Sequence, residues 1–171
     1  MNNKNRIAIV GISGSGKSTL ANKIGIKLGR PVIHLDKHYW DVGWKERYST
    51  KEEFREVVKK MAEADTWIID GNYRSSIDIR LARADTIIFL DFPKWKCLWR
   101  AFKRVLNRKQ PFDKVEGVKA KIDWPLVKFI LTYPQYEMRA KIESYKEGRE
   151  VLVAKNDRET EKILQNITTL V

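Results

Sequence analysis

The chain has 171 residues and 43% of them are hydrophobic, which fits one globular domain with a sizeable core. No stretch approaches the ~18 consecutive apolar residues of a membrane span, and the apolar run after Arg6 is too short for a secretory signal. The single cysteine, Cys97, cannot form an internal disulfide and fits a reducing compartment. We therefore expect one cytoplasmic domain over residues 1–171 without a membrane partner, and the sequence leaves its oligomeric state open.

The formal net charge is +12, and it is unevenly distributed along the chain. Ten basic and two acidic residues lie between Lys94 and Lys121, so this stretch alone carries +8. A block of this kind attracts anions, either polyphosphates or the backbone of a nucleic acid. A solvated helix face is the plainer interpretation.

The first predicted strand, residues 6–10, leads into Gly-Ile-Ser-Gly-Ser-Gly-Lys-Ser-Thr at residues 11–19. This sequence matches the phosphate-binding P-loop, in which glycines let backbone N–H groups point at phosphate oxygens. Lys17 would bind the β- and γ-phosphates, and the Ser18 hydroxyl would bind Mg²⁺. A helix predicted over residues 18–28 would direct its positive end at the nucleotide, and Gly29 would end it. The residues expected to bind a nucleoside triphosphate are Gly11, Ser13, Gly14, Ser15, Gly16, Lys17, Ser18 and Thr19.

Predicted strands and helices alternate along the rest of the chain. The strands are 31–35, 66–69, 86–90 and 150–154, and the helices are 51–64, 75–84, one opened by Pro93, interrupted segments within 123–147, and 159–170. Thr50 and Glu53 form a predicted capping box, and Pro125 and Pro134 are the predicted interruptions. This alternation predicts an α/β fold of three α/β/α layers, the P-loop NTPase fold, with a five-stranded parallel sheet.

Polar residues follow several of these strands, and ligands of parallel sheets collect at the carboxyl ends of the strands. Asp70 ends the apolar run Ile68-Ile69 and is the expected second ligand of Mg²⁺, directly or through water. Asp36 follows the second predicted strand. It could orient or deprotonate an attacking hydroxyl, share the metal, or only cap a helix.

Several segments together carry a resemblance that covers about residues 6–165. They are the P-loop, His34-Leu35-Asp36, Trp67-Ile68-Ile69-Asp70-Gly71-Asn72-Tyr73-Arg74, residues 86–91 and the basic helix after Pro93. The chain resembles the nucleoside-monophosphate and small-molecule kinases. More narrowly, it is similar to the adenylate-kinase-related DNA topology modulation proteins. The resemblance implies ATP and Mg²⁺ as cofactors, a small-molecule phosphoryl acceptor and a helical lid.

The same resemblance assigns roles to further residues. In related kinases an Asp-Gly segment is followed by Pro-Arg, and its arginine grips the acceptor; Asp70 and Arg74 match, whereas Asn72-Tyr73 replaces Phe/Tyr-Pro. A lid over about residues 94–121, with its tip at 107–121, would neutralise the transferred phosphoryl group through Arg100 and Arg104, with Arg108 a further candidate. Asn156 matches the loop that contacts adenine.

Three further features of the sequence carry expectations of their own. A segment over about residues 37–64 would cover the acceptor, and its Tyr39, Trp40 and Trp44 would either stack on a ligand or pack over the sheet edge. His34 and His38 have no metal-ligand partners at a suitable spacing, so we expect structural roles. In the predicted lid helix, six apolar residues share one stripe while Arg100, Arg104 and Arg108 recur on another. The apolar residues are Trp95, Leu98, Trp99, Phe102, Val105 and Leu106.

The sequence therefore favours an ATP- and Mg²⁺-dependent phosphotransferase whose acceptor is a small molecule, with a nucleotide or nucleoside as one candidate. The alternative is an ATP-binding protein that associates with nucleic acid and modulates DNA topology, because the basic stretch suits both. No helix-turn-helix, zinc module or RNA-binding signature accompanies that stretch. A bare ATPase with a protein partner is the third interpretation.

Overall fold

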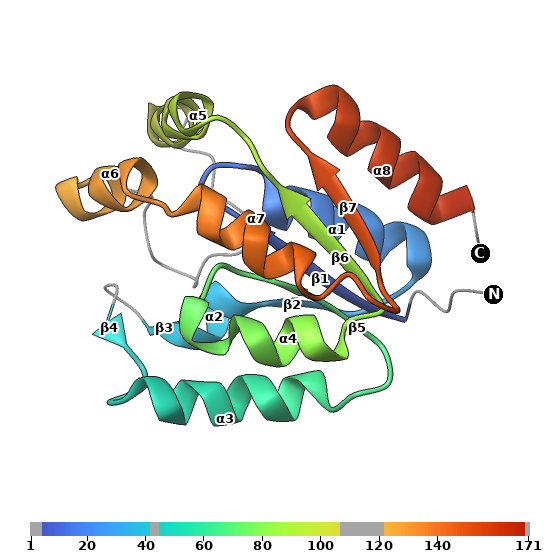
Figure 1. Ribbon diagram of the computed structural model, residues 1–171. Helices are drawn as coiled ribbons and strands as arrows, with labels where there is room; N and C mark the ends of the chain where they lie inside the picture. The colour runs from blue at the N-terminus through green and yellow to red at the C-terminus, as the bar shows by residue number, and fades with distance from the viewer. Residues whose placement is uncertain (1–4, 42–44, 107–121, 170–171) are drawn as a thin grey trace.

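The structure is a computed structural model that describes residues 5–41, 45–106 and 122–169 (Figure 1). Five parallel strands form its central sheet in the order β2-β5-β1-β6-β7. The strands are β1 (Arg6–Gly11), β2 (Val32–His34), β5 (Trp67–Asp70), β6 (Thr86–Leu90) and β7 (Glu150–Ala154). The predicted five-stranded parallel sheet is confirmed.

Helices cover both faces of this sheet, which confirms the three-layer prediction. Figure 1 shows α1 (Lys17–Leu28) and α8 (Asp157–Thr169) on one face and α4 (Ile77–Arg83) and α7 (Gln135–Glu143) on the other, with α3 (Lys51–Ala62) packed outside α4. The remaining elements are α2 (Leu35–Tyr39), the antiparallel pair β3 (Trp40–Asp41) and β4 (Lys45–Glu46), the 3₁₀ turn η1 (Arg74–Ser76), α5 (Lys94–Leu106) and α6 (Trp124–Leu131).

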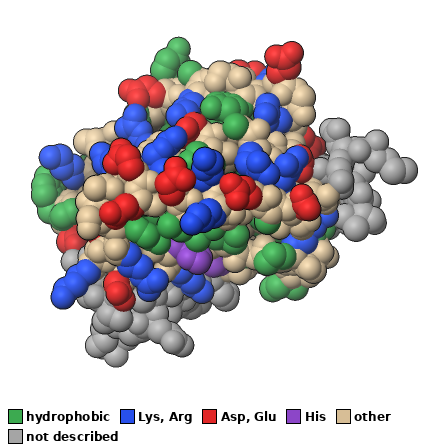
Figure 2. Space-filling view, turned by 90° about the horizontal axis from the view of Figure 1, so that it is seen from below, with side chains coloured by type: hydrophobic (Ala, Val, Ile, Leu, Met, Phe, Trp, Pro, Cys, Tyr) green, Lys and Arg blue, Asp and Glu red, His purple; other side chains and the backbone are tan. Residues whose placement is uncertain are grey.

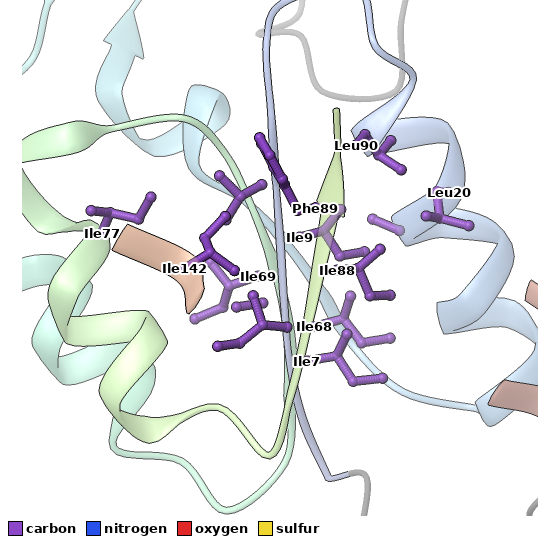
Figure 3. Close-up of a cluster of buried hydrophobic side chains, with 14 of the residues drawn as sticks. Ile7, Ile9, Leu20, Ile68, Ile69, Ile77, Ile88, Phe89, Leu90 and Ile142 are labelled. Carbon is purple, nitrogen blue, oxygen red and sulfur yellow. The ribbon is translucent and has the colours of Figure 1, made fainter. Parts of the chain in front are cut away.

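The core lies on both sides of the sheet because successive strand residues point to opposite faces. Figure 3 shows this alternation in β6, where Ile88 and Leu90 point toward Leu20 of α1 and Phe89 points to the other face. Ile77 of α4 and Ile142 of α7 meet that second face. All six side chains are at most 2% exposed. Continuous apolar strands of this kind are typical of a parallel sheet covered on both faces.

Two predicted helix ends are confirmed in detail. Gly29 ends α1 with φ +61°, the left-handed conformation that glycine adopts without strain. The Thr50 hydroxyl accepts the backbone N–H of Glu53 at 3.2 Å. The Glu53 carboxylate accepts the backbone N–H of Ser49 at 2.8 Å. A capping box would instead use the N–H of Thr50, one residue later.

Several predicted boundaries are wrong for identifiable reasons. The second strand ends at His34, one residue before the predicted end, because Leu35 begins α2, and Asp36 lies in the first turn of that helix. Pro125 does not interrupt a helix but occupies the first turn of α6, where its missing N–H is not needed. The last helix begins at Asp157, two residues before the predicted start. The short pair β3–β4 had no clear signal because each strand has two residues.

Helix α5 is amphipathic, but its apolar stripe does not all enter the core. Trp95, Trp99, Phe102 and Leu106 are exposed, whereas Cys97 and Ala101 on another face are buried. The buried face is the one that meets the P-loop. The predicted lid tip, residues 107–121 with Arg108, and Trp44 lie outside the described residues.

Charge is mixed on the face that α3 covers. Figure 2 shows Lys and Arg side chains interspersed with Asp and Glu there, so the net +12 is not gathered on this face. Among the described residues, no helix combines the length and the apolar composition needed to cross a bilayer.

Candidate active site

The P-loop joins β1 to α1 and packs against α5. Gly14 and Gly16 have φ of +84° and +98°, values that favour glycine. A Cβ on Gly14 would lie 2.3 Å from the carbonyl oxygen of Cys97 in α5, so this contact excludes a side chain. The Lys17 ammonium donates to the carbonyl of Ile12 at 3.1 Å. Within the described part of the chain, the buried Ser15 hydroxyl has no hydrogen-bond partner.

Ser18 and Asp70, the two predicted metal ligands, lie next to each other. The Ser18 hydroxyl donates to Asp70 Oδ2 at 2.7 Å. Asp70 is the last residue of β5 and is opposite Ile9 of β1 and His34 of β2 in the sheet register. The other carboxylate oxygen, Oδ1, contacts Nδ1 of the buried His34, so Asp70 is held from two sides. Two oxygen donors beside a P-loop are the ligand type that Mg²⁺ prefers, so these residues fit the metal.

A cavity of about 1110 Å³ extends from the P-loop to α2, α3 and α6. Seven of the predicted nucleotide-binding residues, 13–19, line it, whereas Gly11 lies at the end of β1 and does not. The predicted residues Asp36, Arg74, Arg100 and Arg104 also line the cavity. The structure therefore brings most of the predicted site to one space. That space is large enough for a nucleotide and a second small molecule.

The segment Asn72-Tyr73-Arg74 also lines the cavity. The Tyr73 hydroxyl donates to Asp36 Oδ1 at 2.7 Å, and burial raises the pKa of this phenol far above its usual range. Asn72 Oδ1 accepts the hydroxyl of Tyr133 at 3.0 Å. Arg74, with its side chain 57% exposed, pairs with Glu137 of α7 at 3.2 Å.

Arg80 supports this segment from beneath. Its side chain is fully buried and donates to the carbonyls of Gly71 at 3.0 Å and Tyr73 at 3.4 Å. Burial lowers the pKa of Arg80 to about 10, so the guanidinium remains charged at neutral pH. A buried cation that binds two carbonyls fixes the backbone on which Asn72 and Tyr73 are carried.

The two arginines of α5 have different surroundings. Arg100 donates to the carbonyl of Ser15 in the P-loop at 3.1 Å, contacts Asp157, and stacks over the Phe92 ring at 4.8 Å. Burial alone would raise the pKa of Asp157, but hydrogen bonds from Lys96 and Arg100 lower it. Arg104 lies one turn further along the helix. Its buried Nε has no hydrogen-bond partner among the described residues.

Asn156 is not on the cavity wall. Its side chain caps α8, with Oδ1 accepting the N–H of Glu159 at 2.9 Å and Nδ2 donating to the Glu159 carboxylate at 2.7 Å. Asp157 and Thr160 of the same helix line the cavity instead. The adenine contact assigned to Asn156 stays a prediction.

The aromatic residues after Asp36 divide between packing and the cavity. Tyr39 packs against Phe54 and Tyr73 with ring centroids 4.9 and 4.7 Å apart, as the packing alternative expects. Tyr39 and Trp40 also line the cavity. The packing interpretation therefore applies to Tyr39, and stacking on a ligand stays a prediction.

Three residues that support the site were missed in the sequence. Arg80 had a usable signal, because it stands next to Leu81 and three residues after Ile77 on the apolar face of a predicted helix. The structural role predicted for His34 does not include its contact with Asp70. Tyr133 had no signal, because it meets Asn72 across 61 residues of sequence.

Comparison with solved structures places this architecture among known folds. Shikimate kinase from Acinetobacter baumannii, in complex with shikimate, matches with a TM-score of 0.61 and 18% identity over 99% of this chain and 93% of its own. Deoxyadenosine kinase from M. mycoides, with dCMP and dCDP bound, matches with a TM-score of 0.57 and 17% identity over 97% and 100%. The chain has the fold of small-molecule P-loop kinases.

Shikimate kinase from Bacteroides thetaiotaomicron is a further structural match, with a TM-score of 0.55 and 22% identity over 97% of both chains. No protein-family model matches the sequence, and no curated protein is significantly similar to it. At these identities the likeness concerns the fold, so the chemistry of the site has to be argued from its own residues.

Proposed function

We propose that this protein is an ATP- and Mg²⁺-dependent phosphotransferase that acts on a small-molecule acceptor. The observation that carries the proposal is the hydrogen bond between Ser18 and Asp70 beside the P-loop, next to a cavity that both the P-loop and Asp36 line. A phosphoryl donor and an acceptor would thus share one enclosed space. In such a transfer, positioning and charge stabilisation supply most of the rate.

The donor end would bind ATP through the P-loop. Lys17 and the loop N–H groups would hold the β- and γ-phosphates, and Ser18 and Asp70 would hold Mg²⁺. When bound, the ion would neutralise negative charge on the phosphates. Ser15, whose buried hydroxyl lacks a partner among the described residues, would donate to the nucleotide. Arg100, fixed between the P-loop and Asp157, would shape the nucleotide side of the cavity.

The acceptor end would hold the second substrate near the γ-phosphate. Asp36 would orient the attacking group, and Tyr73 would keep the carboxylate in place. Arg104 and Arg74 would stabilise the charge of the transferred group, because a guanidinium binds phosphate oxygens in a planar fork. Arg104 is the better placed of the two for this role, since Arg74 is paired with Glu137.

The test is ADP formation from Mg·ATP by the purified protein across a panel of acceptors. The panel would include nucleosides, nucleoside monophosphates, sugars, small acids and duplex DNA, with Lys17→Ala as the blank. We expect at least one small molecule to stimulate ADP formation well above this blank. If none does so while ATP is bound, phosphotransfer to a small molecule is the wrong function.

Association with DNA stays the alternative prediction. In the described part of the basic stretch, Lys94, Lys96 and Arg100 are engaged within the protein by Leu131, Asp157 and Ser15. These contacts favour a role of the three side chains within the candidate active site over binding to the phosphate backbone of DNA. A DNA-binding function would instead appear as affinity that falls steeply with salt.

A further inference from the structure

We infer that Arg80 is a positioning residue for phosphotransfer, which sets Asp36 in the cavity through the backbone of residues 71–73 and the Tyr73 hydroxyl. The inference rests on the proposed function, in which Asp36 orients the attacking group. Three contacts carry it: that of Arg80 with this segment, that of Gly71 with α2, and that of Tyr73 with Asp36.

Arg80 lies in α4 and holds the segment by two backbone oxygens. Its Nη1 donates to the carbonyl of Gly71 at 3.0 Å, and its Nη2 donates to the carbonyl of Tyr73 at 3.4 Å. These carbonyls belong to the residues on either side of Asn72. Because the guanidinium is planar and its donors have fixed directions, a single group orients the backbone before and after Asn72.

Burying Arg80 is a costly way to stabilise a fold. Its side chain is fully buried, and within the described residues it donates to these two carbonyls alone, while its Nε has no partner. A buried cation without a paired carboxylate loses much of its hydration free energy and regains only part of it in hydrogen bonds. The presence of Arg80 is therefore better explained by the residues whose backbone it holds.

Gly71 brings the held segment against the helix that contains Asp36. Its φ is +150°, and a Cβ at this position would lie 2.8 Å from the Cβ of Leu35. Leu35 is fully buried and is the first residue of α2, next to Asp36 in the chain. Since this close approach leaves no room for a side chain, a shift of residue 71 would also displace the start of α2.

Tyr73 completes the connection to the carboxylate. Its ring packs against those of Tyr39 and Phe54, with centroids 4.7 and 4.8 Å away. Its hydroxyl donates to Asp36 Oδ1 at 2.7 Å. Because the ring is held on its backbone and by two neighbouring rings, the position of the hydroxyl follows that of the backbone which Arg80 binds.

The connection predicts a defect in the chemical step. Asp36 and Tyr73 line the cavity, whereas Arg80 is not on its wall, so Arg80 would act through the carboxylate without touching the substrate. A displacement of about 1 Å in the group that orients the attacking atom is enough to lower the rate about a hundredfold. We therefore expect variants of Arg80 to lose kcat and to keep the KM of ATP.

Arg83 provides a matched control in the same helix. It also donates to two backbone carbonyls, those of Ala62 at 2.6 Å and Glu63 at 3.2 Å at the end of α3. In the described part of the chain, neither Arg83 nor these two residues line the cavity. Arg83→Lys therefore measures what the loss of such a contact costs in stability alone.

The kinetic experiment uses Mg·ATP and the compound of the acceptor panel that gives the fastest ADP formation by the parent. Arg80→Met should lower kcat about a hundredfold, and Arg80→Lys, which keeps the charge but not the planar fork, about tenfold. Arg83→Lys should keep the parent kcat. Arg80→Lys serves if Arg80→Met fails to fold. A parent-like kcat in Arg80→Lys, or an equal loss in Arg83→Lys, would overturn the inference.

A double-mutant cycle tests whether the effect passes through Tyr73. Tyr73→Phe removes only the hydroxyl and should lower kcat about tenfold. When Tyr73→Phe is already present, Arg80→Lys should lower kcat much less than it does in the parent, because the connection to Asp36 is broken. If the two effects multiply, Arg80 does not act through Tyr73. A merely structural role would lower the Tm without this coupling in kcat.

Amide hydrogen exchange tests the same connection without an acceptor. Arg80→Lys should speed exchange both in residues 71–76 and in α2, whereas Arg83→Lys should speed it in neither. Faster exchange in residues 71–76 alone would contradict the inference. If the parent phosphorylates no compound of the panel, the proposed function fails while exchange still decides whether Arg80 positions Asp36. The two failures are therefore separate observations.

Discussion

Asp70 shows how the candidate site depends on single hydrogen bonds. Its carboxylate is 3% exposed and is held by Ser18 on one oxygen and His34 on the other. His34 in turn lies 3.4 Å from the Asn22 side chain of α1 through its other ring nitrogen. Residues behind a metal ligand orient it and tune its affinity. His34 is thus a positioning residue for Asp70.

His34→Ala should therefore weaken Mg²⁺ binding about 10- to 100-fold, because Asp70 loses the group that orients it. The measurement is calorimetric binding of ATP at increasing Mg²⁺ concentration, so that no turnover is needed. His34→Asn, whose amide can still donate to Asp70, should restore part of the affinity. An unchanged Mg²⁺ dependence in His34→Ala would show that His34 does not position the ligand.

His38 makes a pH-dependent contribution to stability. Burial, with help from Arg47, Lys37 and His34, lowers its pKa below the ordinary 6.5. Below pH 6.5 the unfolded chain binds a proton at His38 that the folded chain binds only at lower pH. Stability is therefore lost as the pH falls from 6.5 to the folded-state pKa. His38→Gln should lose less thermal stability than the parent between pH 7.5 and 5.5, and equal losses would refute this contribution.

Among the elements, α5 has the largest consequence for the site. Its buried face, with Cys97 and Ala101, packs on the P-loop, and the same rotation directs Arg100 and Arg104 into the cavity. Contact with the loop backbone requires the small residues on that face. The larger apolar residues Trp95, Trp99, Phe102 and Leu106 consequently remain outside.

The different contacts of the two arginines predict different kinetic defects. Arg104→Ala should lower kcat about a hundredfold or more with little change in the KM of ATP, because it removes a donor to the transferred group. Arg100→Ala should mainly raise the KM of ATP, since Arg100 holds Ser15 of the P-loop. Lys103→Ala, exposed on the same helix, is the control. If kcat survives in Arg104→Ala, the lid assignment is wrong.

At the scale of the whole molecule, the strand order assembles the site. β5 lies between β1 and β2, so Asp70 stands between the P-loop after β1 and Asp36 after β2. The carboxyl ends of parallel strands meet at one edge, where ligands of such sheets bind. Ser18 and Asp70 are thereby joined across 52 residues of sequence.

Nucleotide binding should stabilise this assembly as a whole, because ATP would contact the folded chain alone. At a concentration 100 times its Kd, Mg·ATP should raise the Tm by about 5 to 10 °C. Differential scanning calorimetry would measure the shift, with Lys17→Ala as the control that should show little of it. A parent protein whose Tm does not respond to Mg·ATP would contradict the P-loop assignment.

The fold class and the position of the P-loop were predictable because both depend on local sequence patterns. The P-loop is contiguous in sequence, and β5 is a short apolar run that ends in Asp70, so Lys17, Ser18 and Asp70 could be proposed as site residues directly. Helix caps such as Thr50 and Gly29 are equally local. These features depend on spacing over a few residues, which the sequence alone determines.

Other properties depended on contacts between distant residues. The place of β5 between β1 and β2, the contact of His34 with Asp70 and the bond of Tyr133 to Asn72 arise from crossovers that no short pattern encodes. The face of α5 that is buried is the one that packs closely against Gly14, and not the apolar stripe of the helix. The sequence by itself determined an α/β fold with a P-loop sequence, and only the tertiary structure decided which side chains line the cavity, because packing across the sheet sets their positions.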